Sequence, residues 1–215
     1  MSTTQPDGYL ATPAAGSGDP VLVLHPWWGL NATIRAFCDR LAAEGFVVFA
    51  PDLYHGKVVD TIPDAEAAVH ELSGTYEQAQ VEVAEAAAFL GERVGNDGRG
   101  LAVIGFSMGV YYALALASAA PDLVRNVVIF YGTGDADFSA SRAAYLGHFA
   151  GDDDFEPREY VDGMEEALRH AGRPVTFYHY PGTGHWFFEP DRADAYNEEA
   201  AALAWARTLK FLQEF

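Results

Sequence analysis

The sequence predicts an α/β fold of three layers, in which helices cover both faces of a mostly parallel sheet. Short apolar runs alternate with longer amphipathic or alanine-rich segments along the whole chain, as expected for strands that alternate with helices. One apolar run leads directly through a Gly-x-Ser-x-Gly pentapeptide into an alanine-rich segment, which is typical of a strand, a sharp turn and a helix. No linker, composition break or repeat divides residues 1–215, so we expect one domain.

Apolar periodicity places the individual elements. Asn31 is expected to cap a helix that ends at Gly45 and that buries Cys38, as an inert thiol, on its apolar face. We expect strands at residues 9–12, 21–24, 46–50, 101–104, 126–131, 145–149 and 175–180. Further helices are expected at residues 63–72, 76–94, 111–120 and 158–171 and from about 193 to 215, with a turn at 95–100. The helix at 76–94 is expected to carry Val81, Ala84, Ala88 and Phe89 inward.

Charge and composition restrict the partners of the chain. Acidic residues outnumber basic ones by 31 to 13, which gives a net charge of −18 and argues against nucleic acid or an anionic membrane as a partner. A single cysteine excludes an intrachain disulfide and suits a reducing compartment. The polar start resembles no signal peptide and no apolar run is long enough to span a membrane, so we expect a cytoplasmic protein, monomeric or homodimeric.

The pentapeptide from Gly105 to Gly109 reads as a nucleophile elbow. A serine on so sharp a corner needs small neighbours, because the strand behind it and the helix ahead of it crowd the backbone. The hydroxyl of Ser107 is thereby presented at the edge of the sheet. The N–H of Met108, at the start of the following helix, is free to face a developing negative charge. A glycine-rich βα turn without chemistry is the alternative interpretation.

A base and an acid follow the serine in the order found in triads of this kind. His185 lies in a glycine-rich loop directly after the last expected strand, which makes it the candidate base. The acidic triplet Asp152 to Asp154 follows an earlier strand and offers a carboxylate to orient the imidazole. A solvated or cation-binding acidic turn is the alternative for the triplet. No histidine has metal-ligand spacing and no phosphate or dinucleotide loop occurs, so we expect neither metal nor cofactor.

Five segments together resemble the dienelactone hydrolase family, and the resemblance spans nearly the whole chain. They are the segments 25–31, 50–54, 105–109, 148–157 and 184–187. The resemblance implies the α/β-hydrolase fold and an oxyanion hole formed by the backbone N–H groups of Met108 and Trp27. The family's acid precedes a proline by four residues, which selects Asp153 from Pro157, whereas counting from the usual glycine selects Asp154. We prefer Asp153.

Two departures from the family bear on the chemistry. Family enzymes that act on dienelactone resemble one another in having a cysteine nucleophile and a glutamate in the first loop, where this chain has Ser107 and Pro26. A serine hydroxyl is not ionised at neutral pH and therefore depends on a general base throughout the reaction. The family's arginine that binds a substrate carboxylate is also absent shortly after His185, where Glu189 stands in the segment 186–189. An anionic lactone is therefore not the expected substrate.

Aromatic residues crowd the loops at the strand ends and predict an apolar pocket. They are Trp27, Trp28, Tyr54, Tyr131, Trp186, Phe187 and Phe188, of which Trp28, Tyr54 and Trp186 are the candidate substrate contacts. The sequence thus predicts a serine hydrolase that cleaves small carboxylic esters or lactones through an acyl-enzyme. The alternatives are a protein that keeps this fold but only binds, and an acyltransferase that uses the same triad.

Overall fold

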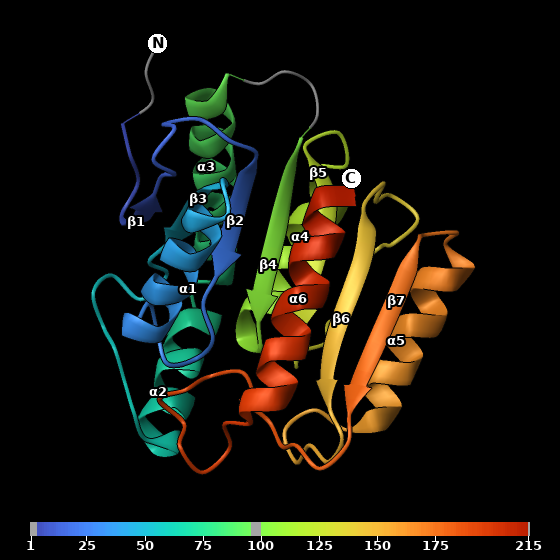
Figure 1. Cartoon of the computed structure of the whole chain (residues 1–215). Coiled ribbons are helices and arrows are strands. Elements are labelled where there is room, and N and C mark those ends of the chain that lie inside the picture. Colours follow the sequence, from blue (N-terminus) through green and yellow to red (C-terminus); the bar gives the residue numbers. More distant parts are fainter. Residues whose placement is uncertain (1–3, 96–99, 215) are drawn as a thin grey trace.

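A seven-stranded sheet organises the molecule in the computed structural model, which describes residues 4–95 and 100–214 (Figure 1). The strands lie in the order β1-β3-β2-β4-β5-β6-β7. Their bounds are β1 Gly8–Ala11, β2 Pro20–Leu24, β3 Val47–Pro51, β4 Leu101–Phe106, β5 Val124–Phe130, β6 Ala144–Ala150 and β7 Val175–Tyr180. Only the edge pair of β1 with β3 is antiparallel, and all other neighbouring pairs are parallel.

Helices cover both faces of this sheet, which confirms the three-layer α/β fold. They are α1 Ala32–Ala43, α2 Ile62–Ser73, α3 Tyr76–Val94, α4 Met108–Ala119, α5 Arg158–His170 and α6 Glu198–Glu214. Helices α1 and α6 pack against one face, and α3, α4 and α5 pack against the other (Figure 1). The strands β2 to β6 are almost entirely buried between these layers, as is typical of parallel strands covered by helices on both faces.

Local sequence signals explain where several elements begin. The Asn31 side chain accepts a hydrogen bond from the N–H of Ile34 at 3.0 Å, so it caps α1 as expected. Cys38 is fully buried on that helix, and burial raises the pKa of its thiol. Strand β7 has the predicted bounds, and α3 spans the predicted residues.

Two expectations about helices are wrong. In α3, Val81 is exposed, as are Ala84 and Ala88, and of the predicted inward set only Phe89 is buried. The buried side chains are instead those of Ala79, Val83, Ala86, Ala87, Phe89 and Leu90. Alanines occur on both sides of this helix, so hydrophobic periodicity alone cannot choose its inward face.

The last helix begins at Glu198 and not near residue 193. Residues before it form turns, in which the N–H groups of Ala195 and Tyr196 both donate to the carbonyl of Arg192. Asn197 then accepts from the N–H of Ala200 at 3.0 Å and fixes the start of the helix. Of the turn expected at residues 95–100, residues 96–99 lie outside the described part of the chain. No helix within the described residues is long and apolar enough to cross a membrane.

Candidate active site

Ser107 lies on a strained corner between β4 and α4. Its φ of 47° falls in the left-handed region, which a non-glycine residue occupies only where the surrounding structure forces it. The N–H of Ser107 donates to the carbonyl of Phe130 at the end of β5, which ties the corner to the neighbouring strand. A Cβ on Gly109 would lie 2.4 Å from the carbonyl oxygen of Leu24, and one on Gly105 would lie 2.7 Å from the Cα of Val110. Both glycines are therefore required by the close packing around the serine.

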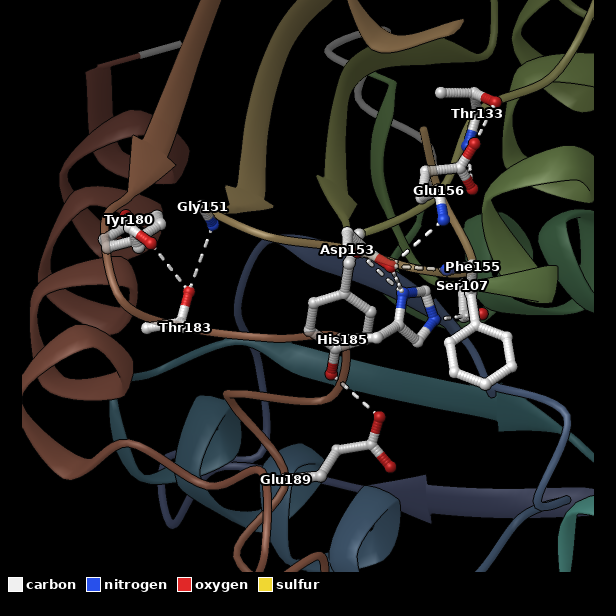
Figure 2. Close-up of polar contacts among 11 residues, drawn as sticks. Ser107, Thr133, Gly151, Asp153, Phe155, Glu156, Tyr180, Thr183, His185 and Glu189 are labelled. Atoms are coloured by element: carbon white, nitrogen blue, oxygen red, sulfur yellow. Dashed lines mark hydrogen bonds and ion pairs between the residues drawn. The ribbon is translucent and has the colours of Figure 1, made fainter. Parts of the chain in front are cut away.

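The structure brings Ser107, His185 and Asp153 into one line of hydrogen-bonding groups (Figure 2). The Oγ atom of Ser107 lies 3.0 Å from Nε2 of His185. On the far side of the ring, Nδ1 of His185 lies 2.8 Å from one carboxylate oxygen of Asp153 and 2.9 Å from the other. The side chains of His185 and Asp153 are 4% and 7% exposed, so water competes little for this pair.

The loop after β6 presents Asp153, not Asp154, to the histidine. The N–H groups of Phe155 and Glu156 both donate to Oδ1 of Asp153 at 3.0 Å, and so orient its carboxylate. Asp154 is exposed to solvent. The position counted from Pro157 is thus the one that the loop directs at His185.

A second carboxylate fastens this loop to its neighbour. Glu156 accepts hydrogen bonds from the N–H of Thr133, at 3.1 Å, and from the Thr133 hydroxyl, in the loop after β5 (Figure 2). Burial raises the pKa of Glu156, while the bonds from Thr133 and the nearby His185 act in the opposite direction. The pair joins the loop that carries Asp153 to the loop after β5, the strand beside β4.

The two candidate oxyanion donors come from the ends of β2 and β4. Met108 is the first residue of α4, so its N–H has no partner within the helix. Trp27 lies in a tight turn, which the N–H of Gly29 closes by donating to the carbonyl of Pro26 at 3.1 Å. The hydroxyl of Tyr54 lies 3.4 Å from the Met108 sulfur, so this candidate pocket residue contacts the residue after the serine.

Tryptophan side chains form one wall beside the histidine. Trp27, Trp28 and Trp186 contact one another with ring centroids 5.2 to 5.9 Å apart. Trp28 is only 1% exposed, and the guanidinium of Arg192 lies 3.8 Å above its ring. Trp28 thus supports the wall from behind, whereas Trp186 contacts the imidazole edge-on at 5.1 Å.

Phe155 is a site residue that the sequence reasoning missed. Its ring lies 5.3 Å from the imidazole of His185, 5.5 Å from Trp27 and 4.8 Å from Trp186, and the residue is 44% exposed. Figure 2 shows this ring beside Ser107 and His185. An aromatic residue directly after three aspartates, where a solvated turn would otherwise be polar, was the available signal.

A cavity of about 360 Å³ lies next to this wall. Phe155, His185 and Trp186 contribute to its lining. Its carboxylates come from Asp152, Asp154 and Asp194, and none of the described residues that line it is a lysine or arginine. Among the described residues no group of three or more His, Cys, Asp or Glu side chains is arranged to hold a metal ion.

The sheet is mostly parallel, and Ser107 lies on a strained corner between a strand and a helix at its carboxyl edge. This serine is hydrogen-bonded to a histidine from the loop after the last strand. Together these features define an α/β hydrolase. The chain belongs to the dienelactone hydrolase family, whose model matches residues 7–215. Membership of this family supports the conclusion that the chain hydrolyses ester substrates.

Relatives match over almost the full length of the chain. "Protein usf" of Aquifex pyrophilus is 32% identical over 97% of this chain and 93% of its own length. A "Putative carboxymethylenebutenolidase" of Aquifex aeolicus is 31% identical, with the same coverage of both chains. Among solved structures, a "Putative Dienelactone Hydrolase" of Klebsiella pneumoniae superimposes with a TM-score of 0.85 at 26% identity, and it covers 100% of this chain and 98% of that one.

Proposed function

We propose that this chain is a serine hydrolase that cleaves small, uncharged carboxylic esters or lactones through an acyl-enzyme on Ser107. The observation that carries the proposal is the unbroken path from Ser107 through His185 to Asp153, with heavy-atom distances of 3.0 and 2.8 Å. These distances lie within the range required for proton transfer between a nucleophile, its base and the group that orients the base.

Each residue has one role in the proposed reaction. The Oγ atom of Ser107 attacks the carbonyl carbon while Nε2 of His185 takes its proton, and Asp153 stabilises the resulting imidazolium. The backbone N–H groups of Met108 and Trp27 donate to the oxyanion of the tetrahedral intermediate. When the intermediate collapses, the carbon–oxygen bond to the leaving group breaks and His185 returns the proton to that oxygen. Water then attacks the acyl-enzyme by the same route and regenerates the serine.

A serine nucleophile is consistent with the proline at position 26 in the first loop. In the resembling enzymes a glutamate in the first loop accompanies a cysteine nucleophile, whereas Pro26 carries no carboxylate that could accept the proton of a thiol. A serine nucleophile does not need such a carboxylate, because His185 alone accepts its proton. The base and its orienting carboxylate are nearly fully buried, which strengthens their interaction by excluding water. The chain's serine and its proline are therefore consistent with each other.

Charge near the site favours an uncharged substrate. The 360 Å³ cavity beside His185 is lined by three aspartates, and the arginine that resembling enzymes place shortly after the histidine to bind a substrate carboxylate is absent from this sequence. A carboxylate on the substrate would be repelled there. The aromatic wall of Trp27, Phe155 and Trp186 instead offers apolar contact. Matched esters that differ only in a terminal carboxylate test this, and faster turnover of the anionic member would overturn it.

The role of Ser107 is tested with p-nitrophenyl acetate and a fluorophosphonate probe. Ser107→Ala should abolish both turnover and labelling, with an unchanged far-UV circular dichroism spectrum. Ser118→Ala is the matched control, because it removes a hydroxyl from the far end of α4, the helix that follows Ser107, and that hydroxyl donates to the carbonyl of Asp137. Near-normal turnover in Ser107→Ala would refute the proposal, and an unlabelled, inactive wild-type protein would favour a binding protein that only keeps the fold.

The triad acid is tested by a matched pair. Asp153→Asn should lower kcat by about 10⁴-fold, because a neutral amide neither holds the neutral imidazole in the required tautomer nor stabilises the imidazolium that forms. Asp154→Asn leaves the proton path intact, so its effect on kcat should be small by comparison. Equal losses in the two variants would contradict the assignment of Asp153. Product analysis with alcohol and water in competition separates hydrolysis from acyl transfer.

A further inference from the structure

Among the described residues, three aromatic rings contact the imidazole of His185, and one of them, Tyr131, is also held by a hydrogen bond at the end that points away from the imidazole. Phe155 is 44% exposed and Trp186 is 9% exposed, whereas Tyr131 is fully buried. The Tyr131 ring lies 5.0 Å from the imidazole at an interplanar angle of 59°. Its hydroxyl donates to Oε1 of Glu189 at 2.8 Å. Tyr131 is therefore a rigid wall for the histidine that is anchored on a second residue.

The backbone of Tyr131 is held as firmly as its side chain. The residue follows β5 directly and has a φ of 38°, a conformation that a bulky residue adopts only under constraint. Its N–H donates to the carbonyl of His148 in the neighbouring strand at 2.9 Å. The ring also packs edge-on against Phe187 at 5.6 Å. These contacts leave the ring one position, against the imidazole.

Glu189 is a fully buried carboxyl group whose second oxygen has no hydrogen-bond partner within the described residues. Burial raises its pKa to about 8, and the neighbouring Asp191 acts in the same direction. The bond from Tyr131 and the nearby Arg192 act in the opposite direction. Arg40 of α1 lines a shallow groove together with Glu189, and its guanidinium lies 4.0 Å from the centre of the Trp205 ring.

We propose that Tyr131, anchored by Glu189, is a positioning residue that holds the His185 ring in line between Ser107 and Asp153. The proposal rests on the function proposed above. Neither residue touches the reacting atoms: Tyr131 acts by restricting the imidazole, and Glu189 acts by fixing the Tyr131 hydroxyl. A buried carboxyl group with one unpartnered oxygen lowers the stability of the fold. A role in positioning Tyr131 gives a physical reason why Glu189 is nevertheless present here.

Loss of the anchor should lower kcat and leave KM nearly unchanged, because substrate contacts stay in place while the base loses its alignment. Tyr131→Phe keeps the ring and removes the hydroxyl, and we expect kcat to fall at least about tenfold. Glu189→Leu removes the acceptor and should have the same effect. Glu189→Gln keeps an oxygen that accepts from Tyr131, so it should restore most of kcat at pH 7. This rescue distinguishes a hydrogen-bonded anchor from a general need for bulk.

Tyr145→Phe is the matched control. Tyr145 is a buried tyrosine on β6 whose hydroxyl contacts Oγ of Ser141 at 2.7 Å, so the variant makes the same chemical change outside the site. It should lose a comparable amount of stability and keep kcat. An unchanged kcat in Tyr131→Phe would overturn the proposal. So would an equal loss of kcat in Tyr131→Phe and Tyr145→Phe, which would indicate destabilisation and not positioning.

The nitrogen resonances of the His185 ring provide a readout that needs no turnover. In Tyr131→Phe the Nδ1–H signal, which reports the bond to Asp153, should shift or broaden, and in Tyr145→Phe it should stay in place. If wild type hydrolyses no ester but the His185 signal responds in this way, the proposed function fails and the positioning role stands. If wild type is active and neither kcat nor the signal responds to Tyr131→Phe, the positioning role fails.

Discussion

Glu189→Gln should make the free energy of unfolding less dependent on pH. The pKa of Glu189 is raised from 4.5 to about 8 in the folded protein, chiefly by burial. Between pH 4.5 and about pH 8 the folded state retains a proton on Glu189 that the unfolded state has released, so the stability of the wild-type protein falls as pH rises. The two pKa values differ by about 3.5, and each pKa unit corresponds to about 1.4 kcal/mol. The free energy of unfolding is therefore lower by about 5 kcal/mol once the carboxyl is ionised in the folded protein.

Urea denaturation of the wild-type protein and of Glu189→Gln at pH 5, 6, 7 and 8 measures this effect. The glutamine variant has nothing to ionise, so its stability relative to the wild-type protein should increase by roughly 1.4 kcal/mol per pH unit across this range. The exposed Glu66 on α2 supplies the control, because Glu66→Gln should show no such trend. A difference between Glu189→Gln and the wild-type protein that stays constant from pH 5 to 8 would refute the reasoning, since Glu189 would then be ionised in the folded protein throughout.

Three further predictions concern packing, the loop tether and a buried histidine. Gly109→Ala should lower the free energy of unfolding by about 1 to 3 kcal/mol, because the new Cβ would lie 2.4 Å from a carbonyl oxygen of β2. Gly163→Ala is the control: it lies within α5 with open space around it, so it should raise the free energy of unfolding by about 0.5 to 1 kcal/mol. Thermal unfolding compares the two variants. Thr133→Val should reduce kcat by loosening the loop that Glu156 holds, and a kcat equal to that of the wild-type protein would show that this tether has no part in positioning the acid. Burial lowers the pKa of His148 from 6.5 to about 3. The buried neutral histidine therefore contributes fully to stability above pH 6.5, and about 5 kcal/mol of this stability is lost as the pH falls to 3. In His148→Phe, the free energy of unfolding measured by urea denaturation should fall less steeply with decreasing pH over this range.

Features that depend on neighbours in the chain could be predicted from the sequence. The elbow at Ser107 is an example, because the apolar strand, the two glycines and the helix that strain its backbone all lie within a few residues of it. The Asn31 cap is another, since its partner Ile34 is three residues away. Such signals also gave the alternation of strands and helices, and hence the fold class.

Helix faces and element ends needed the surrounding structure. The inward face of α3 was mispredicted because alanine is compatible with either side of a helix, and the packing against β3 and α4 decides which alanines are covered. The start of α6 was mispredicted for a related reason. Residues 191–196 could have continued the helix, but turns centred on Arg192, whose guanidinium lies over Trp28, hold them in another conformation.

The sequence by itself determined the fold class, the family and the strained serine, because each follows from patterns written over adjacent residues. Only the tertiary structure decided that Asp153 and not Asp154 faces the imidazole, that Phe155 lies beside it, and that Tyr131 and Glu189 support it from within. The partners in these contacts are 30 to 58 residues apart in the chain. Which of them meet depends on where parallel strands end along one edge of the sheet, and no local pattern encodes that register.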